Sequence, residues 1–277
     1  MPRVTPPAFR WLLLLWLALA LTWPVARAAD ADAVAAWELI GRHLPKDALA
    51  GLQAKPARGS RESALAVAVV RMDIQPVTEA GLNKVAEQLT ELARGTDEIA
   101  DASAYLTARL YQSHFFTPDY ARAAADYEQL AAKSPASTWA QLGLVKLMLL
   151  KLYVLPEPAE PAARVAAAEA LLARVTLPDL QRDAHIVLGR ARLFHGQPMD
   201  TVLAHLLVAD RIGGLTGLKR VELQLQIAEL SRREKLWEQA RVYFQRFLDE
   251  NEVDGRIYTV KAKLAEIAAA QRAEGRP

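Results

Sequence analysis

Histidine is the residue type in this chain that most readily suggests acid–base or metal chemistry. His185, His195 and His205 follow one another at intervals of ten residues, so a helical hairpin could bring two of these side chains together. Their neighbours are mostly aliphatic, and neither these residues nor His43 and His114 form an H-E-x-x-H, an H-x-H or another metal-ligand spacing. We therefore expect partly buried structural histidines, and we expect no metal ion, no cofactor and no catalytic residue.

Glycine-rich and acidic motifs also have structural interpretations. Residues 213–217 (GGLTG) follow an expected helix and lack the Lys-Ser/Thr of a phosphate-binding loop, so they predict a helix end and a turn. Asp97 and Glu98 fit the start of a helix, where negative charge complements the helix dipole, and Asp249 and Glu250 fall at a helix end. No G-x-S-x-G motif occurs, and paired acids for glycoside hydrolysis would need a pocket that the sequence does not locate.

The charge balance and the cysteine count exclude several classes of function. With 34 basic and 32 acidic side chains, the net charge of +2 gives no general electrostatic basis for binding nucleic acid. The pairs Arg232–Arg233 and Arg272/Arg276 lack interleaved aromatic residues, so we interpret them as solvated surface. Because the chain has no cysteine, it can form no disulfide, thiolate zinc site, iron–sulfur cluster, cysteine nucleophile or lipid-modified cysteine.

The N-terminus has the order of features of a secretory signal peptide. Arg3 and Arg10 are followed by an apolar run over residues 11–23, and residues 26–28 (ARA) place small residues at both key positions of a cleavage site. An apolar run of this length gives about 20 Å of helix, short of the roughly 30 Å hydrocarbon core of a bilayer. Cleavage near Ala28 is therefore favoured over an uncleaved membrane anchor.

Cleavage changes the charge balance and sets the expected location. Residues 1–28 contain three of the 34 basic residues and no acid, which leaves 31 basic against 32 acidic side chains. Residues 145–155 come closest to a later membrane span, but Lys146 and Lys151 interrupt them. We expect a periplasmic or secreted protein with no integral membrane span after cleavage, and with stability that rests on helix packing because it has no disulfides.

The rest of the chain has the composition of an all-α protein. The whole chain has 52 alanines, about a fifth of its residues, and most other positions hold strong helix formers. Residues 64–71 (ALAVAVVR) are the single stretch that could be read as a strand. Prolines divide the chain into helix-sized segments. The main expected stops are Pro45, Pro56, Pro76, Pro118, Pro135, Pro156, Pro158, Pro161, Pro178 and Pro198.

Three segments repeat one pattern of small and large residues. In each, a small residue is followed after four and then after three further positions by residues that can fill the gap to a neighbouring helix. The segments are Ala123-Tyr127-Leu130, Ala166-Ala170-Ala173 and Ala240-Phe244-Phe247. Pro135 and Pro178 follow the first two at equal distance, and Glu252 stands at that place after the third. A W-x-x-L-G run, residues 139–143, opens the helix expected after Pro135.

These residues resemble the tetratricopeptide repeat (TPR) family, whose helix–turn–helix unit has this W-x-x-L-G and A-x-x-x-F-x-x-A-x-x-x-x-P pattern. The resemblance covers roughly residues 97–253; it is best over 119–147, fair over 165–178 and 221–248, and stretched over 97–118. It implies an all-α fold of stacked antiparallel helical hairpins that form a TPR-like α-solenoid. A generic array of alanine-rich helical hairpins is the alternative.

The expected organisation has four parts. Residues 1–28 are the signal peptide, and residues 29–95 form an N-terminal helical segment, either degenerate repeats or a cap, with helices over 32–44, 60–72 and 78–94. The apolar stripe on the last of these consists of Leu82, Val85, Ala86, Leu89 and Leu92. Residues 96–253 hold the TPR-like repeats, and residues 254–277 form a C-terminal capping helix with a polar outer face.

The TPR resemblance implies that the first helix of each hairpin lines a concave groove for a peptide or a partner domain. The residues that the alignment places in the groove are Tyr105, Arg109, Gln112, Ala140, Leu144, Asp183, Arg190, Glu222, Glu229 and Arg232. Some family members hold terminal carboxylates with a Lys/Asn clamp. Ala140 and Leu144 stand in the best repeat here, so that clamp is absent, and the mixed groove suits an extended or helical segment with aliphatic anchors.

The function expected from these features is a non-catalytic protein–protein interaction scaffold in the bacterial cell envelope, with a protein or peptide partner and no nucleic acid. Envelope-assembly machinery is among the candidate partners. Two alternatives come from other classes: an exported helical enzyme that acts on the cell wall, and a self-assembling structural spacer. The sequence leaves the oligomeric state open.

Overall fold

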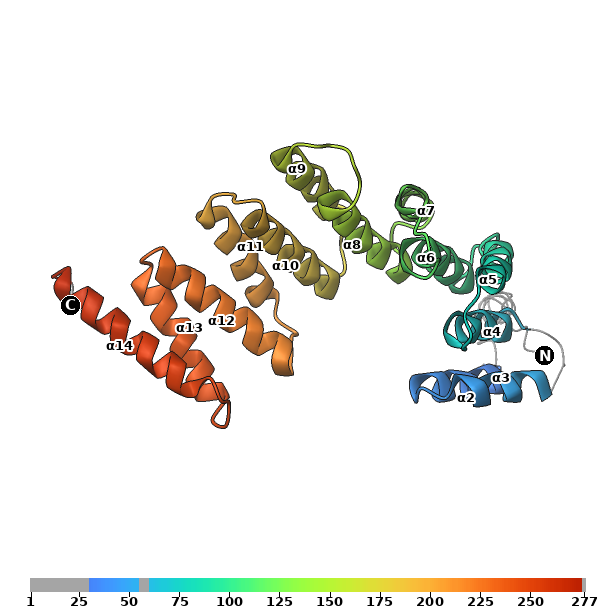
Figure 1. Cartoon of the computed structure of the whole chain (residues 1–277), viewed down its shortest axis with the longest axis horizontal. Coiled ribbons are helices and arrows are strands. Elements are labelled where there is room, and N and C mark those ends of the chain that lie inside the picture. Colours follow the sequence, from blue (N-terminus) through green and yellow to red (C-terminus); the bar gives the residue numbers. More distant parts are fainter. Residues whose placement is uncertain (1–29, 55–59, 276–277) are drawn as a thin grey trace, which may run out of the picture. The chain divides into compact units, whose positions relative to one another are not determined.

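The computed structural model describes residues 30–54 and 60–275 (Figure 1). These residues form thirteen helices, and no strand occurs among them. The expected signal peptide over residues 1–28 lies outside the described residues. The chain divides between Val70 and Arg71 into two compact units. The expectation of an all-α protein is confirmed.

The first unit contains α2 (Ala31–Gly41), α3 (Pro45–Ala54) and most of α4 (Arg61–Asp73). The Asp30 carboxylate caps α2 by accepting from the Asp32 backbone N–H at 3.0 Å, and it also accepts from the Ser63 hydroxyl at 2.7 Å. Hydrogen bonds from Ser60 and Ser63 lower the pKa of Asp30 to about 2. One acidic side chain therefore joins the starts of α2 and α4.

The helix expected over residues 60–72 is present as α4, so the stretch 64–71 is helical and not a strand. One expectation for this segment is wrong. Pro45 begins a helix where a stop was expected, so the described residues between 30 and 95 form four helices and not three. Proline is well suited to the first turn of a helix, because the N–H that it lacks would have no partner there.

The second unit contains the end of α4 and ten further helices. These are α5 (Glu79–Leu92), α6 (Glu98–Ser113), α7 (Tyr120–Lys133), α8 (Thr138–Tyr153), α9 (Pro161–Leu172), α10 (Pro178–Phe194), α11 (Met199–Ile212), α12 (Gly217–Arg233), α13 (Trp237–Glu250) and α14 (Ile257–Ala273). Each packs against the next helix in the sequence, and α8 also packs against α6 and α10 (Figure 1). We call α6, α8, α10, α12 and α14 the first helices and α5, α7, α9, α11 and α13 the second helices.

The repeated pattern lies in the core in two of the three segments. Ala123, Tyr127 and Leu130 of α7 are buried, as are the corresponding residues of α13, namely Ala240, Phe244 and Phe247. The apolar stripe expected on α5 is also fully buried. Small residues at the first place of the pattern let neighbouring helices approach, and the aromatic residues fill the space that remains.

The face of α9 that was expected to be buried is the wrong one. Ala166, Ala170 and Ala173 are all exposed, and the side chains that α9 buries are Val165, Ala168 and Leu171. Alanine is small enough for either face of a helix, so a pattern made only of alanines does not fix which face is buried. The larger apolar residues Val165 and Leu171 determine the orientation.

Some helix ends follow the capping residues. Asp97 caps α6 by accepting from the Ala100 N–H at 2.9 Å, and Gly213 ends α11 with a φ of 76°. Pro161 and Pro178 begin α9 and α10, although they were expected to stop helices. The expected C-terminal helix is α14, the last helix described.

A buried glutamine in the W-x-x-L-G run connects two turns. Gln141 has no exposed surface, and its amide Nε2 donates to the Pro135 carbonyl at 2.7 Å and to the Arg174 carbonyl at 2.9 Å. Its Oε1 accepts from the Thr176 N–H at 2.6 Å. Because an unpaired buried amide would be costly, these bonds hold the turn before α8 against the turn before α10.

Candidate functional site

The ten residues expected to line a groove all come from the first helices α6, α8, α10 and α12. Three of them, Tyr105, Ala140 and Leu144, are buried in the core. The other seven are half-buried or exposed, and they are Arg109, Gln112, Asp183, Arg190, Glu222, Glu229 and Arg232.

The three buried residues cannot contact a partner in this conformation. Ala140 and Leu144 are on α8, which packs against α6, α7, α9 and α10 and therefore buries most of its circumference. The ring of Tyr105 lies between Tyr127, with ring centroids 5.9 Å apart, and Trp139, at 5.5 Å. Their assignment to a groove was wrong because the alignment identified the helix but not the face of the helix that the neighbouring helices cover.

Polar side chains of three successive first helices lie close enough to interact. Arg109 on α6 donates to Gln112 Oε1 at 2.9 Å, and the same oxygen accepts from the Tyr127 hydroxyl at 2.8 Å. Burial lowers the pKa of Lys146 on α8, the charge of Arg109 lowers it further, and the charge of Asp183 on α10 raises it. Arg109, Lys146 and Asp183 are each half-buried, on first helices of which α8 packs against both α6 and α10.

Direct contacts connect polar side chains of the C-terminal first helices. Arg190 Nε on α10 donates to Gln226 Oε1 on α12 at 3.3 Å. Glu229 on α12 accepts from Arg232 and from Lys263 on α14, and these hydrogen bonds lower the pKa of Glu229 to about 2. We call the polar surface of the first helices the first-helix face and define it by Arg109, Lys146, Asp183, Arg190, Glu222, Glu229, Arg232 and Lys263.

Three cavities lie where a second helix meets its neighbours. The first, of about 430 Å³, lies among α5, α6 and α7, and its lining includes the basic side chains of Arg94, Arg122 and Lys133. Each of these cations already has a partner in the protein; the Arg122 guanidinium, for example, lies 3.7 Å above the Tyr111 ring. Asp126 also lines this cavity, and burial raises the pKa of its carboxyl group.

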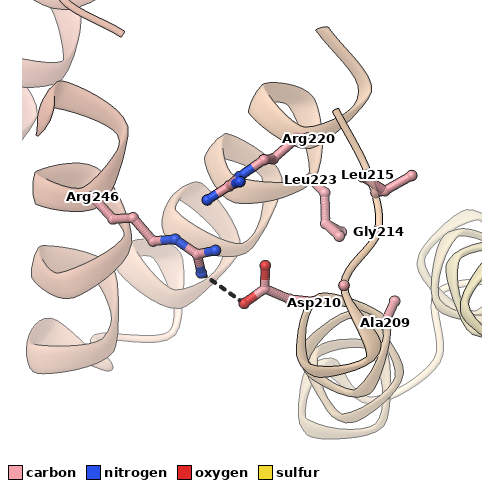
Figure 2. Close-up of a pocket in the computed structure, with 8 residues that line it drawn as sticks. Ala209, Asp210, Gly214, Leu215, Arg220, Leu223 and Arg246 are labelled. Carbon is pink, nitrogen blue, oxygen red and sulfur yellow. Dashed lines mark hydrogen bonds and ion pairs between the residues drawn. The ribbon is translucent and has the colours of Figure 1, made fainter. Parts of the chain in front are cut away.

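The second cavity, of about 90 Å³, lies between α11, α12 and α13 (Figure 2). Asp210 projects into it from the end of α11, and Arg246 projects from α13 toward Asp210 (Figure 2). Arg220 and Leu223 of α12 and Gly214 of the preceding turn complete much of its lining. A cavity of this size has room for water but not for a substrate of ordinary size.

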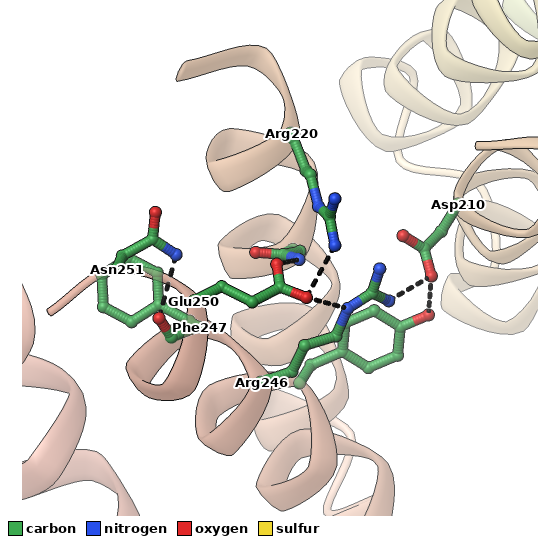
Figure 3. Close-up of polar contacts among 8 residues, drawn as sticks. Asp210, Arg220, Arg246, Phe247, Glu250 and Asn251 are labelled. Carbon is green, nitrogen blue, oxygen red and sulfur yellow. Dashed lines mark hydrogen bonds and ion pairs between the residues drawn. The ribbon is translucent and has the colours of Figure 1, made fainter. Parts of the chain in front are cut away.

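A polar network beside this cavity connects the three helices (Figure 3). Asp210 Oδ2 accepts from Arg246 Nη1 at 2.9 Å and from the Tyr243 hydroxyl at 2.8 Å. Glu250 Oε1 accepts from Arg220 Nη2 at 2.6 Å and from Arg246 Nε at 3.2 Å. Because the Arg246 guanidinium bridges two carboxylates, the network is nearly self-neutralised and is suited to holding helices together.

The third cavity, of about 290 Å³, lies between α9, α10 and α11 and contains the histidine pair that the ten-residue spacing suggested. The Nδ1 atoms of His185 and His205 are 3.0 Å apart. His195, in contrast, is the C-cap of α10, and its ring stacks on Tyr153 with centroids 6.1 Å apart. Arg192 and Glu169 also line this cavity.

None of the ten residues expected in the groove lines any of these three cavities. The sequence offered a signal for the histidine pair, because the ten-residue spacing fits a hairpin. It offered none for the network of Asp210 and Arg246, which depends on the way three helices pack.

Within the described residues, no group of three or more His, Cys, Asp or Glu side chains is placed to hold a metal ion. None of the described helices combines the length and the apolar character that crossing a bilayer requires. Comparisons of the sequence with protein-family models and with curated proteins found no match.

Proposed function

We propose that this chain is an exported, non-catalytic protein-interaction scaffold of the bacterial cell envelope, and that a segment of a partner protein binds on its first-helix face. The observation that carries the proposal is that Arg109, Lys146 and Asp183 are half-buried polar side chains on α6, α8 and α10, and that these first helices pack in succession. Polar side chains on successive first helices offer a partner chain contacts on more than one helix.

The resemblance to TPR proteins supports the same surface, because it implies that first helices line the binding groove. Among the residues of this face, Arg190 and Glu222 are exposed, so a partner can reach them without disturbing the core. The N-terminal features of a signal peptide support the location in the envelope.

A charge-reversal experiment tests the proposal. The double variant Arg190→Glu/Glu222→Lys changes two exposed charges of the first-helix face while leaving the net charge unchanged. The matched control is Arg211→Glu/Glu87→Lys, which makes the same two exchanges at exposed positions of the second helices α11 and α5. We expect crosslinking in the native envelope to recover a defined partner with the wild type and the control, and at least about tenfold less with the first double variant.

Equal recovery of that partner with both double variants would contradict the proposed binding face. Turnover of peptidoglycan that one carboxylate substitution abolishes would favour the enzyme alternative. Oligomers that form with rising protein concentration, with no heterologous partner recovered, would favour the structural spacer.

A further inference from the structure

The histidine pair lies where α10 and α11 are in contact. The Nδ1 atoms of His185 and His205 are 3.0 Å apart, and the ring centroids are separated by 5.1 Å. His205 is buried, with 9% of its surface exposed, and His185 is half-buried. Two nitrogen atoms at this distance form a hydrogen bond when one of them carries a proton and the other offers a lone pair.

Neighbouring side chains determine which ring donates. Glu169 on α9 places Oε1 3.3 Å from His205 Nε2, and its other oxygen accepts from Arg192 Nη2 at 2.6 Å. Because a carboxylate only accepts, His205 carries its proton on Nε2, which leaves its Nδ1 as a lone pair. The Nδ1–H of His185 then donates to His205.

This arrangement tolerates one added proton but not two. The first added proton goes to Nε2 of His185, and the hydrogen bond between the two Nδ1 atoms stays intact. A second proton has to be placed on Nδ1 of His205, directly against the Nδ1–H of His185. The hydrogen bond is then lost and two positive charges face each other.

The close contact between α10 and α11 beside the pair limits how far the two backbones can shift to relieve that repulsion. Gly189 lies one turn after His185, and a Cβ at this position would be 2.9 Å from Leu206 Cδ2 and 3.3 Å from His205 Cβ. The backbone of α10 is therefore already in close contact with α11 beside the pair. The adjoining cavity of about 290 Å³, lined also by Thr201, gives the pair room for water and hence for proton exchange.

We propose that the His185–His205 pair is an acid-operated latch, which holds α10 against α11 while it carries at most one added proton and releases that contact when both rings are protonated. The charged side chains that act on the pair are Glu169 from α9 and Arg192 from α10, which are paired with each other. Burial lowers the pKa of both histidines, and the charge of His205 lowers the pKa of His185 further, whereas Glu169 raises both. The latch therefore opens below the ordinary titration range of histidine.

Opening of the latch should also change the proposed binding surface. Helix α10 carries Asp183 and Arg190, so loosening of α10 displaces these two residues of the first-helix face. This consequence for a partner rests on the proposed function, whereas the latch is a property of the chain alone. An experiment without a partner therefore tests the latch separately.

The test compares unfolding by urea at about pH 7.5 and about pH 5 for the wild type, His185→Gln and the control His195→Gln. The amide introduced by His185→Gln cannot be protonated, so the second charge no longer faces His205 in that variant. We expect the midpoint urea concentration of the wild type and of His195→Gln to fall on acidification by more than that of His185→Gln. The variant His205→Gln gives a second, independent measurement if His185→Gln does not fold.

Two direct measurements on the wild type locate the effect. Nuclear magnetic resonance of the histidine Cε1–H signals should show two coupled titrations below the ordinary value of about 6.5. Amide hydrogen exchange at low pH should increase in α10 and α11 relative to α6 and α7, after correction for the intrinsic effect of pH.

Three results would overturn the proposal. One is an equal acid-induced shift of the midpoint in the wild type and in both pair variants. Another is independent titration of the two histidines near about 6.5. A third is an increase in melting temperature on addition of zinc chloride that occurs in the wild type but not in His185→Gln, because the pair would then be a metal-ligand set.

Discussion

The ring of Tyr127 lies so close to Gly143 that a Cβ at position 143 would be 3.1 Å from Cδ1 of Tyr127. Tyr127 is fully buried, and its hydroxyl is held by Gln112 at 2.8 Å, so the ring has little freedom to move away. The glycine of the W-x-x-L-G run therefore lets α8 approach α7 closely. A side chain at position 143 would need the Tyr127 ring or the helices to shift slightly.

We expect Gly143→Ala to destabilise the protein. Overpacking costs roughly 1–3 kcal/mol, and the better helix propensity of alanine offsets about 1 kcal/mol of that cost. The net loss should be about 1 kcal/mol in urea unfolding followed by circular dichroism. Gly51→Ala in α3 is the control, because a Cβ there has no neighbour within 4 Å and should increase the stability of its own unit. A stabilised Gly143→Ala would mean that Tyr127 moves freely.

A pair of substitutions in α9 tests which face of this helix is buried. Ala168 has no exposed surface, so Ala168→Glu places a charge in the core and should cost more than about 3 kcal/mol. Ala166 is exposed, so Ala166→Glu should change stability by no more than about 0.5 kcal/mol. Urea midpoints of the two variants give the comparison. If Ala166→Glu were the more destabilising variant, the buried face of α9 would be the one that the repeated alanines suggested.

Removal of the bridging guanidinium should weaken the contact between α11 and α13. Arg246→Met leaves Asp210, whose side chain is 15% exposed, and Glu250 without a shared cation. We expect a loss of about 1–3 kcal/mol, reduced from the buried limit because solvent reaches the Arg246 side chain. Arg241→Met on the same helix removes an exposed ion pair with Glu238 and should cost less than about 0.5 kcal/mol. Equal effects of the two variants would show that the bridge does not stabilise the packing.

Glu229 should contribute to acid sensitivity. Hydrogen bonds from Arg232, Lys263 and Arg233 lower the pKa of Glu229 from 4.5 to about 2, against a smaller opposing effect of burial. Because the folded value is the lower one, the stabilisation is present above pH 4.5 and is lost as the pH falls toward 2. Unfolding measured across this range should show the wild type more stable than Glu229→Gln near neutral pH, with the difference closing in acid. A difference that stays constant with pH would contradict this.

The sequence predicted an all-α protein, and strong local signals located several of the helix boundaries. The N-cap of Asp97, the helix end at Gly213 and the stripe on α5 each depend on a few neighbouring residues. Proline was harder to interpret, since it disfavours the helix before it and favours the helix after it. Helix boundaries were therefore correctly expected at Pro161 and Pro178, but each proline begins a helix where it was expected to end one.

Side-chain orientation was predictable only where the residues were large. Tyr127, Phe244 and Phe247 could be assigned to the core because exposure of such rings is costly. The alanines of α9 carried no comparable preference, and Leu144 was assigned to a groove although four helices surround α8. Burial in a stack depends on how many neighbours a helix has, and that information is not local.

Contacts between residues that are far apart in the sequence also differ in how predictable they were. The spacing of His185 and His205 matches a hairpin, so their approach could be anticipated from the length of the two helices. Arg246 meets Asp210 across helices that are not adjacent in the sequence, and neither residue belongs to a recognisable motif. Prediction of such a bridge requires the packing angle and register of α11, α12 and α13 together.

The packing of every helix from α5 to α14 against its neighbour in the sequence has a consequence for folding. A chain whose contacts are mostly short in sequence separation has a low contact order, and it closes few long loops on the way to its native state. Each hairpin can begin to bury its apolar side chains as soon as its second helix is available. A chain that emerges end first from a narrow pore could therefore fold progressively, one hairpin after another.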